Sequence, residues 1–179
     1  MAEITLRSIT QENWVECIGL KPTAEQRAGH FVADNTLSLA QASANFGVNF
    51  AIASPPGYSF SEEAMSEIGE IAERNGGSLE AYENPETAVQ GADVVYTDTW
   101  VSMGQEAETE QREAALRPYQ VNDELVRRAG TNAIVMHCLP AHRGHEITDS
   151  VADGVQSAIF QQAENRMHIQ KAILATLMR

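Results

Sequence analysis

Residues able to do chemistry follow three predicted strands, each at the point where the strand ends. Asp98 closes the apolar run 93–99, and His137 and Cys138 close the run 132–138. Arg166 lies at the start of the last predicted helix, just after a short run at 157–160. Together these residues offer a carboxylate, an imidazole, a thiol or thiolate, and a guanidinium group on one edge of the predicted sheet.

Each of these residues also has a purely structural interpretation. Asp98 could cap a helical turn, Cys138 could be a small buried apolar residue, and Arg166 could pair with Glu164. The spacing of the histidines at 137, 142 and 145 matches no standard zinc pattern, so we expect no metal. The sequence also contains no glycine-rich phosphate loop, so we expect no nucleotide and no other cofactor.

The elements that must position these residues alternate regularly. Short apolar runs at 48–54, 78–82, 93–99, 132–138 and 157–160 predict five strands, and helical spacing predicts helices between them and a terminal helix over 163–178. This pattern predicts an α/β fold, a doubly wound, Rossmann-like parallel sheet of about five strands flanked by helices, as one three-layer domain over 1–179. In such sheets, ligands bind at the carboxyl ends of the strands.

Composition limits the possible partners. The chain has 179 residues and a net charge of −13, which argues against nucleic acid or an anionic membrane as a partner. It has no run of eighteen apolar residues and no apolar core of a secretory signal near its start. Cys17 and Cys138 are far apart in sequence, and we expect both to be reduced, in a cytoplasmic protein.

From about residue 45 onward, five segments closely resemble one family. They are ADVVYTDTWVSMGQE (92–106), RPYQVNDEL (117–125), MHCLPAHRG (136–144), EITD (146–149) and AENRMHIQKAILATL (163–177). Together they resemble the second, ornithine-binding domain of ornithine carbamoyltransferases. The pairing of D-x-W-x-S-M-G with H-C-L-P is the most specific part of this resemblance.

The resemblance implies a role for individual residues. It implies catalytic roles for Asp98 and Cys138, and a cis peptide bond between Leu139 and Pro140. The implied ornithine-binding residues are Asp98, Ser102, Met103 and Cys138; the implied carbamoyl-phosphate-binding residues are His137, Cys138, Leu139 and Arg166. In the family's reaction, the neutral δ-amine of ornithine attacks the carbamoyl carbon, and phosphate leaves.

Two features depart from the family pattern. The S-T-R-T motif of the family's other, phosphate-binding domain does not occur, and the G-D-G-N-N turn is reduced to Asp34-Asn35. Residues 1–44 instead resemble the opening β-α-α segment of GNAT-type acetyltransferases, without that family's acetyl-CoA loop. We expect a candidate strand at 4–9 and a helix ending at Gly47 to complete the half-domain formed by residues 45–179.

The sequence therefore predicts a chimeric, engineered or selected α/β domain that keeps part of an ornithine site and lacks carbamoyl-transfer activity on its own. Two alternatives stay open: a residual ornithine carbamoyltransferase, and a structural scaffold with no ligand. We expect weak binding of L-ornithine, and either a monomer or self-association through the surface that faces the other domain in the family.

Overall fold

The computed structural model describes residues 35–101 and 106–178. The predicted strand at 4–9, the start of the predicted N-terminal helix, Cys17, Ser102 and Met103 lie outside the described residues. Of the described residues, those up to Ile159 and those from Phe160 onward belong to two compact units, which are described separately.

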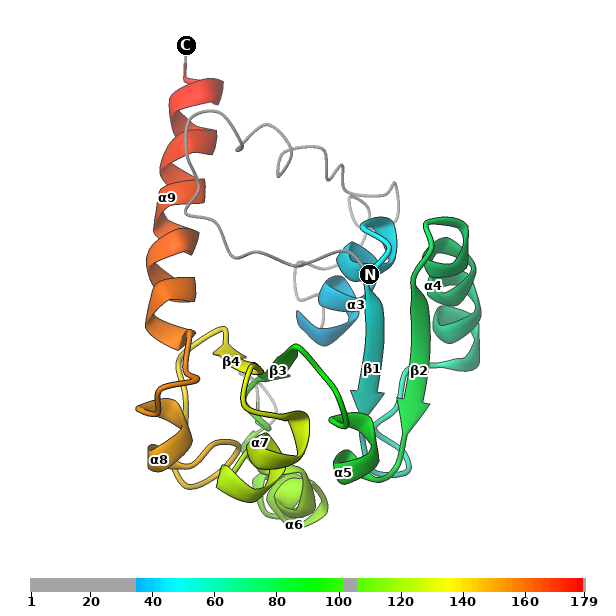
Figure 1. Ribbon diagram of the computed structural model, residues 1–179, viewed down its shortest axis with the longest axis vertical. Helices are drawn as coiled ribbons and strands as arrows, with labels where there is room; N and C mark the ends of the chain where they lie inside the picture. The colour runs from blue at the N-terminus through cyan, green and yellow to red at the C-terminus, as the bar shows by residue number, and fades with distance from the viewer. Residues whose placement is uncertain (1–34, 102–105, 179) are drawn as a thin grey trace. The chain divides into compact units, whose positions relative to one another are not determined.

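Helices and parallel strands alternate along the chain (Figure 1). The elements, in order, are α3 (Asn35–Asn45), β1 (Asn49–Ala53), α4 (Glu62–Arg74), β2 (Ser78–Tyr82), α5 (Pro85–Ala88), β3 (Val94–Thr97), the short 3-10 helices η1 (Glu106–Glu108) and η2 (Arg117–Tyr119) on either side of α6 (Thr109–Leu116), α7 (Asp123–Ala129), β4 (Ile134–His137), α8 (Asp149–Ala152) and α9 (Ile159–Leu177). This order confirms the predicted α/β class.

The first parallel pair is built as a β-α-β unit. Strand β1 pairs with β2 in parallel, with Asn49 opposite Ser78, and α4 connects the two strands. Ser61 caps α4 by accepting a hydrogen bond from the Ala64 N–H at 3.2 Å. Helices α3 and α4 bury a small apolar cluster against β1 and β2, made of Ala40, Ala44, Ile68 and Ala72 with Leu37, Phe50, Phe60, Ile71 and Leu79 at its edge.

The backbone between α3 and β1 approaches the start of β2 closely. A Cβ atom added to Gly77 would lie 2.6 Å from the carbonyl carbon of Gly47 and 2.6 Å from the carbonyl oxygen of Val48. Gly47 itself has a φ of +67°, in the left-handed region that favours glycine. Glycine at both positions therefore lets helix α3 turn directly into the sheet.

The second parallel pair carries the predicted functional residues. Strand β3 pairs with β4, and the register places Thr97 opposite His137. Around them lies the larger apolar core, which includes Val95 and Val135 from the strands, Leu125 from α7, Val151 from α8, and Ile147.

The prediction of a fifth strand over residues 157–160 is wrong in its length, because only one residue of this segment pairs with a strand. The Val135 N–H donates to the Gln156 carbonyl and the Ala158 N–H donates to the Val135 carbonyl, each at 2.8 Å, so this segment forms a single parallel bridge beside β4. Pairing stops there because helix α9 begins at Ile159, four residues earlier than expected. Helix α8 was not predicted.

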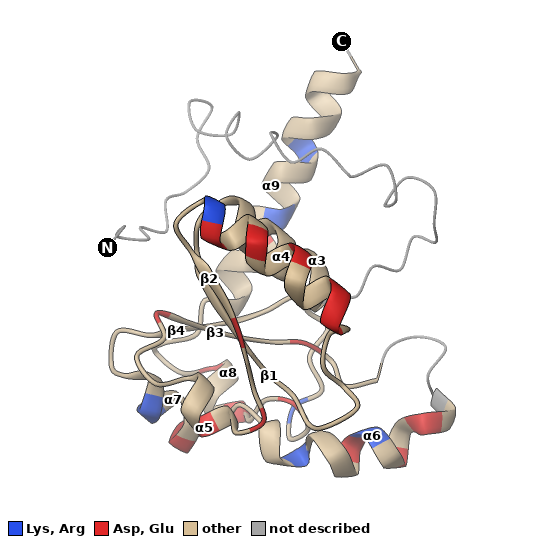
Figure 2. Cartoon of the chain, turned by 90° about the vertical axis from the view of Figure 1, so that its right-hand side faces the viewer, with Lys and Arg blue, Asp and Glu red and all other residues tan. Residues whose placement is uncertain are grey.

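The surface agrees with the acidic composition. Figure 2 shows acidic residues along α4, where Glu62, Glu63, Glu67, Glu70 and Glu73 are exposed while Ile68 and Ala72 are buried. Among the residues that the structure describes, no helix combines the length and the apolar character that a bilayer span requires.

Candidate functional site

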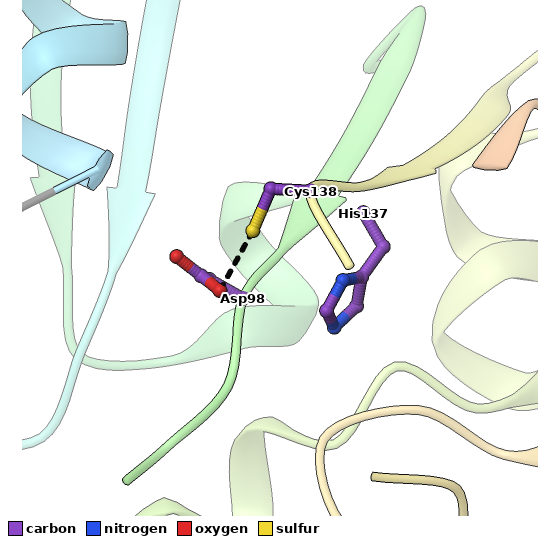
Figure 3. A group of neighbouring side chains, drawn as sticks. All are labelled: Asp98, His137 and Cys138. Atoms are coloured by element: carbon purple, nitrogen blue, oxygen red, sulfur yellow. Dashed lines mark hydrogen bonds between the residues drawn. The ribbon is translucent and has the colours of Figure 1, made fainter. Parts of the chain in front are cut away.

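The register of β3 and β4 brings the two predicted catalytic residues together. Because Thr97 and His137 are opposite each other, the next residues, Asp98 and Cys138, leave the sheet side by side at its carboxyl edge. The Cys138 thiol donates a hydrogen bond to Asp98 Oδ1, with Sγ and Oδ1 2.8 Å apart (Figure 3). The sequence thus located this pair correctly.

Asp98 is also held by its own backbone. Its Oδ1 accepts a hydrogen bond from the Thr99 N–H at 2.7 Å, and the Thr99 hydroxyl lies 3.5 Å from the same oxygen. Residues 98–101 contain no helical turn, so Asp98 is not a helix cap; it binds the next backbone N–H and contacts Cys138 as well. The two contacts orient a partly buried carboxylate at the edge of the sheet.

Cys138 is a thiol at neutral pH. Burial, and then the hydrogen bond to Asp98, raise its pKa from 9.0 to about 11, although a hydrogen bond with Tyr96 acts in the opposite direction. Both the apolar surroundings and the neighbouring carboxylate disfavour a thiolate. Of the two forms considered from the sequence, the structure therefore supports the thiol, which serves as a hydrogen-bond donor.

His137 is fully buried and faces a second carboxylate. Its Nε2 lies 3.2 Å from Oε1 of Glu146, whose side chain is 1% exposed, and its Nδ1 accepts a hydrogen bond from the Leu139 N–H at 2.8 Å. A ring nitrogen that accepts carries no proton, so the proton of the neutral ring is on Nε2 and is donated to Glu146. The predicted contact of His137 with carbamoyl phosphate stays a prediction.

The turn after β4 has an unusual backbone. Leu139 has a φ of +54°, in the left-handed region, and the Leu139–Pro140 peptide bond is cis, which confirms the isomer expected from the resemblance. Leu139 is partly buried beside Cys138. The hydrogen bond from its N–H to His137 therefore stabilises an otherwise unfavourable conformation next to the Asp98–Cys138 pair.

Asp98, His137 and Cys138 also meet the distance requirement for a metal site, since one ligand atom from each lies within 4.8 Å of the others. The chemistry of these donors does not favour a metal. The Cys138 thiol donates to Asp98, and each His137 nitrogen has a hydrogen-bond partner within the protein. The hydrogen bonds account for the proximity of the three side chains.

Three other predicted site residues remain. Ser102 and Met103 lie outside the described residues. Arg166 is an exposed residue of α9, in the unit that begins at Phe160. Their assigned roles stay predictions.

Sequence reasoning missed Tyr96 and Glu146. Tyr96 precedes the end of β3 by one residue, so the strand-end rule could have found it. Glu146 belongs to one of the segments that carry the resemblance, but a glutamate after Gly144 and His145 is typical of a surface loop. Its burial depends on contacts made far away in sequence.

These features define the class of the protein: an α/β domain of Rossmann-like type, with a carboxylate and a thiol paired at the carboxyl edge of its parallel strands. Comparison with known proteins identifies the family. Residues 29–177 match the family model described as aspartate/ornithine carbamoyltransferase, Asp/Orn binding domain, and the chain belongs to this family.

Similar proteins agree with this assignment. The ornithine carbamoyltransferase of Methanopyrus kandleri is 52% identical over 141 residues, which cover 79% of this chain and 45% of that protein. The solved structure of the ornithine carbamoyltransferase from Pyrococcus furiosus superposes with a TM-score of 0.72 at 48% identity, covering 78% of this chain and 44% of that one. A structure of acetylornithine transcarbamylase complexed with acetylcitrulline superposes with a TM-score of 0.67 at 29% identity, covering 79% and 43%. The chain spans less than half the length of these relatives.

Proposed function

We propose that these 179 residues form an ornithine-binding domain in which Asp98 binds an ammonium group of L-ornithine. The observation that carries the proposal is the Cys138–Asp98 hydrogen bond at the carboxyl edge of β3 and β4, in a chain of the Asp/Orn-binding family. A carboxylate already oriented by two donors favours a cation over an anion as its ligand. By the resemblance, Ser102 and Met103 complete this half of the site.

The Cys138 thiol acts as a donor in this proposal. Because its raised pKa keeps it protonated, it neither attacks the substrate nor takes a proton from it at neutral pH. Its role is to orient the carboxylate. A general-base role in removing the proton of the δ-amine would fall to Asp98.

We also propose that these residues alone do not transfer a carbamoyl group. Relatives named for that activity are more than twice as long as the segment matched here, at 45% and 44% coverage. Positioning and electrostatic stabilisation contribute several kcal/mol each to catalysis, so losing half of the positioning groups removes most of the rate. His137, Leu139 and Arg166 would then contact carbamoyl phosphate only where further residues complete its site.

We propose a chimeric origin only for a segment shorter than residues 1–44. The family match begins at residue 29, so residues 29–44 belong to the matched range. The GNAT-like resemblance is therefore proposed only for residues 1–28, which lie outside the described residues.

The test is a ¹H–¹⁵N titration of the chain with L-ornithine, with the variant Asp98→Asn. We expect shifts at the backbone amides of Asp98, Thr99 and Cys138, and their loss in the variant. Asp93→Asn is the matched control, because it makes the same change on an exposed carboxylate just before β3. It should leave the titration unchanged.

Two other outcomes separate the alternatives. A folded chain whose spectrum does not respond to ornithine would be the scaffold, and the binding proposal would fail. Citrulline produced from ornithine and carbamoyl phosphate by these residues alone would show the residual enzyme, and would refute the proposal of inactivity.

A further inference from the structure

Hydrogen bonds to the backbone around Glu146 hold its side chain in the interior of the protein. Its neighbour Ile147 is fully buried, the Glu146 carbonyl accepts from the Val121 N–H at 2.8 Å, and the Thr148 N–H donates to the Val121 carbonyl at 3.1 Å. The Gln120 side chain also donates to the carbonyl groups just before Glu146, at 2.9 and 2.7 Å. The position of the Glu146 carboxylate is therefore fixed from the chain around residue 121.

Both hydrogen bonds to the buried Glu146 carboxylate are made to the same oxygen. Oε1 of Glu146 accepts from His137 Nε2–H and from the His142 N–H. Its other oxygen, Oε2, is buried with no hydrogen-bond partner in the part of the chain that the structure describes, and lies 3.9 Å from His142 Nδ1. An ionised carboxylate is costly to bury, and these bonds are what keep it there.

Two successive hydrogen bonds connect Glu146 to the turn beside the Asp98–Cys138 pair. The carboxylate accepts a hydrogen bond from the His137 Nε2–H, which leaves Nδ1 unprotonated as an acceptor for the Leu139 N–H. Leu139 is the residue with positive φ, directly after Cys138. Glu146 thus acts on the turn beside the Asp98–Cys138 pair indirectly, through its hydrogen bond to the His137 ring.

We propose that Glu146 is a positioning residue: it fixes the tautomer of His137, so that Nδ1 holds the Leu139 N–H and keeps Cys138 directed at Asp98. Without the carboxylate, the ring could take the other tautomer, with Nδ1–H facing the Leu139 N–H, or turn over, with Cδ2–H in that place; only the observed arrangement offers the Leu139 N–H an acceptor. The left-handed backbone of Leu139 would then lose the bond that offsets its strain. The relevance of this role to catalysis rests on the proposed ornithine site, but the role itself is tested without a ligand.

The first measurement is the ¹⁵N spectrum of the histidine rings in the unmodified chain. We expect His137 to be a single tautomer with the proton on Nε2. In Glu146→Leu we expect mixed tautomers, and exchange of the Leu139 amide proton at least about tenfold faster, as loss of one buried hydrogen bond implies. Glu146→Gln keeps an oxygen that accepts from His137 and should retain both properties.

Glu113→Leu is the matched control, because Glu113 pairs with a different histidine, His145, at 3.0 Å. It should leave the His137 tautomer and the Leu139 amide unchanged. If Glu146→Leu does not fold, His137→Asn replaces it: the Asn oxygen takes the place of Nδ1, so the slow exchange of the Leu139 amide should persist without the imidazole.

Several results would overturn the inference. A proton on Nδ1 of His137 in the unmodified chain would contradict it directly. So would a Glu146→Leu variant with the original tautomer and the original Leu139 exchange rate. A failure of ornithine to bind would leave these readouts unaffected, so it bears on the proposed function alone.

Discussion

The Asp98→Asn substitution should change the ionisation of Cys138 by a measurable amount. In the unmodified chain the pKa of Cys138 is raised from 9.0 to about 11, by burial first and by Asp98 second. Well below both values, a rise of two units means about a hundredfold less thiolate, because each unit is a factor of ten. Asn removes the negative charge and leaves the burial. The midpoint should therefore fall below 11 and stay above 9.0.

The assay is the rate of alkylation of Cys138, followed by mass spectrometry of the peptide that contains it. The separate peptide excludes any contribution from Cys17. From about pH 7 to about pH 10, the rate in the unmodified chain should rise about tenfold per pH unit without levelling, since only the thiolate reacts. In Asp98→Asn the curve should begin to level within this range. The shape of the curve is the readout, because the absolute rate also depends on access and on intrinsic nucleophilicity.

The control is Asp93→Asn, which should reproduce the unmodified curve. The reasoning would be refuted by a curve that already levels near pH 9 in the unmodified chain, or by identical curves for the unmodified chain and Asp98→Asn. The first result would mean that Cys138 is not held as a thiol. The second would mean that Asp98 has no effect on it.

Three further predictions concern stability, each measured by urea unfolding. His137→Ala leaves the Glu146 carboxylate buried with one donor fewer, and should lower the free energy of unfolding by about 3 kcal/mol; a loss under about 1 kcal/mol would contradict the buried pairing. The pKa of Glu146 is lowered by the bonds from His137 and His142, which outweigh the opposing effect of burial, so its ionised form stabilises the fold above the ordinary value of 4.5. The advantage of the unmodified chain over Glu146→Gln should thus shrink as the pH falls below 4.5, and a gap that widens would reverse the sign. Gly77→Ala should lower the free energy of unfolding by more than about 1 kcal/mol, because the added Cβ meets backbone atoms. Gly69→Ala, in open space within α4, should raise the free energy of unfolding by about 0.5–1 kcal/mol. Equal effects of the two substitutions would disprove the close approach at Gly77.

The sequence was informative where a local rule determined the structure. Serine and asparagine favour the position just before a helix, and the side chains of Ser61 and Asn84 cap helices α4 and α5. The strand-end rule placed Asp98 and Cys138 at one edge of the sheet, because parallel strands all present their carboxyl ends there. What the rule could not supply was the register of β3 and β4, which decides that the two residues are direct neighbours.

The sequence did not predict the features that depend on contacts between residues far apart in the chain. The apolar run at 157–160 resembles a strand, but its pairing with Val135 is limited to one bridge because the helix-forming residues that follow start α9 at Ile159. Glu146 has the sequence context of an exposed loop and becomes buried only because residue 121 binds its backbone. Neither the bridge nor the burial has a signal in the local sequence.

The two carboxylates act on their partners in different ways, and the difference explains how the site is organised. Asp98 adds to burial in raising the pKa of the Cys138 thiol, while Glu146 keeps the proton of His137 on Nε2. In both cases the carboxylate favours one form of a neutral partner, and that partner then donates or accepts a defined hydrogen bond. The Asp98 carboxylate, only partly buried, is left as the charged member of the Asp98–Cys138–His137 group, with its orientation set by the thiol. A group of this kind suits the ammonium ligand that we propose, and it does not itself supply a nucleophile at neutral pH.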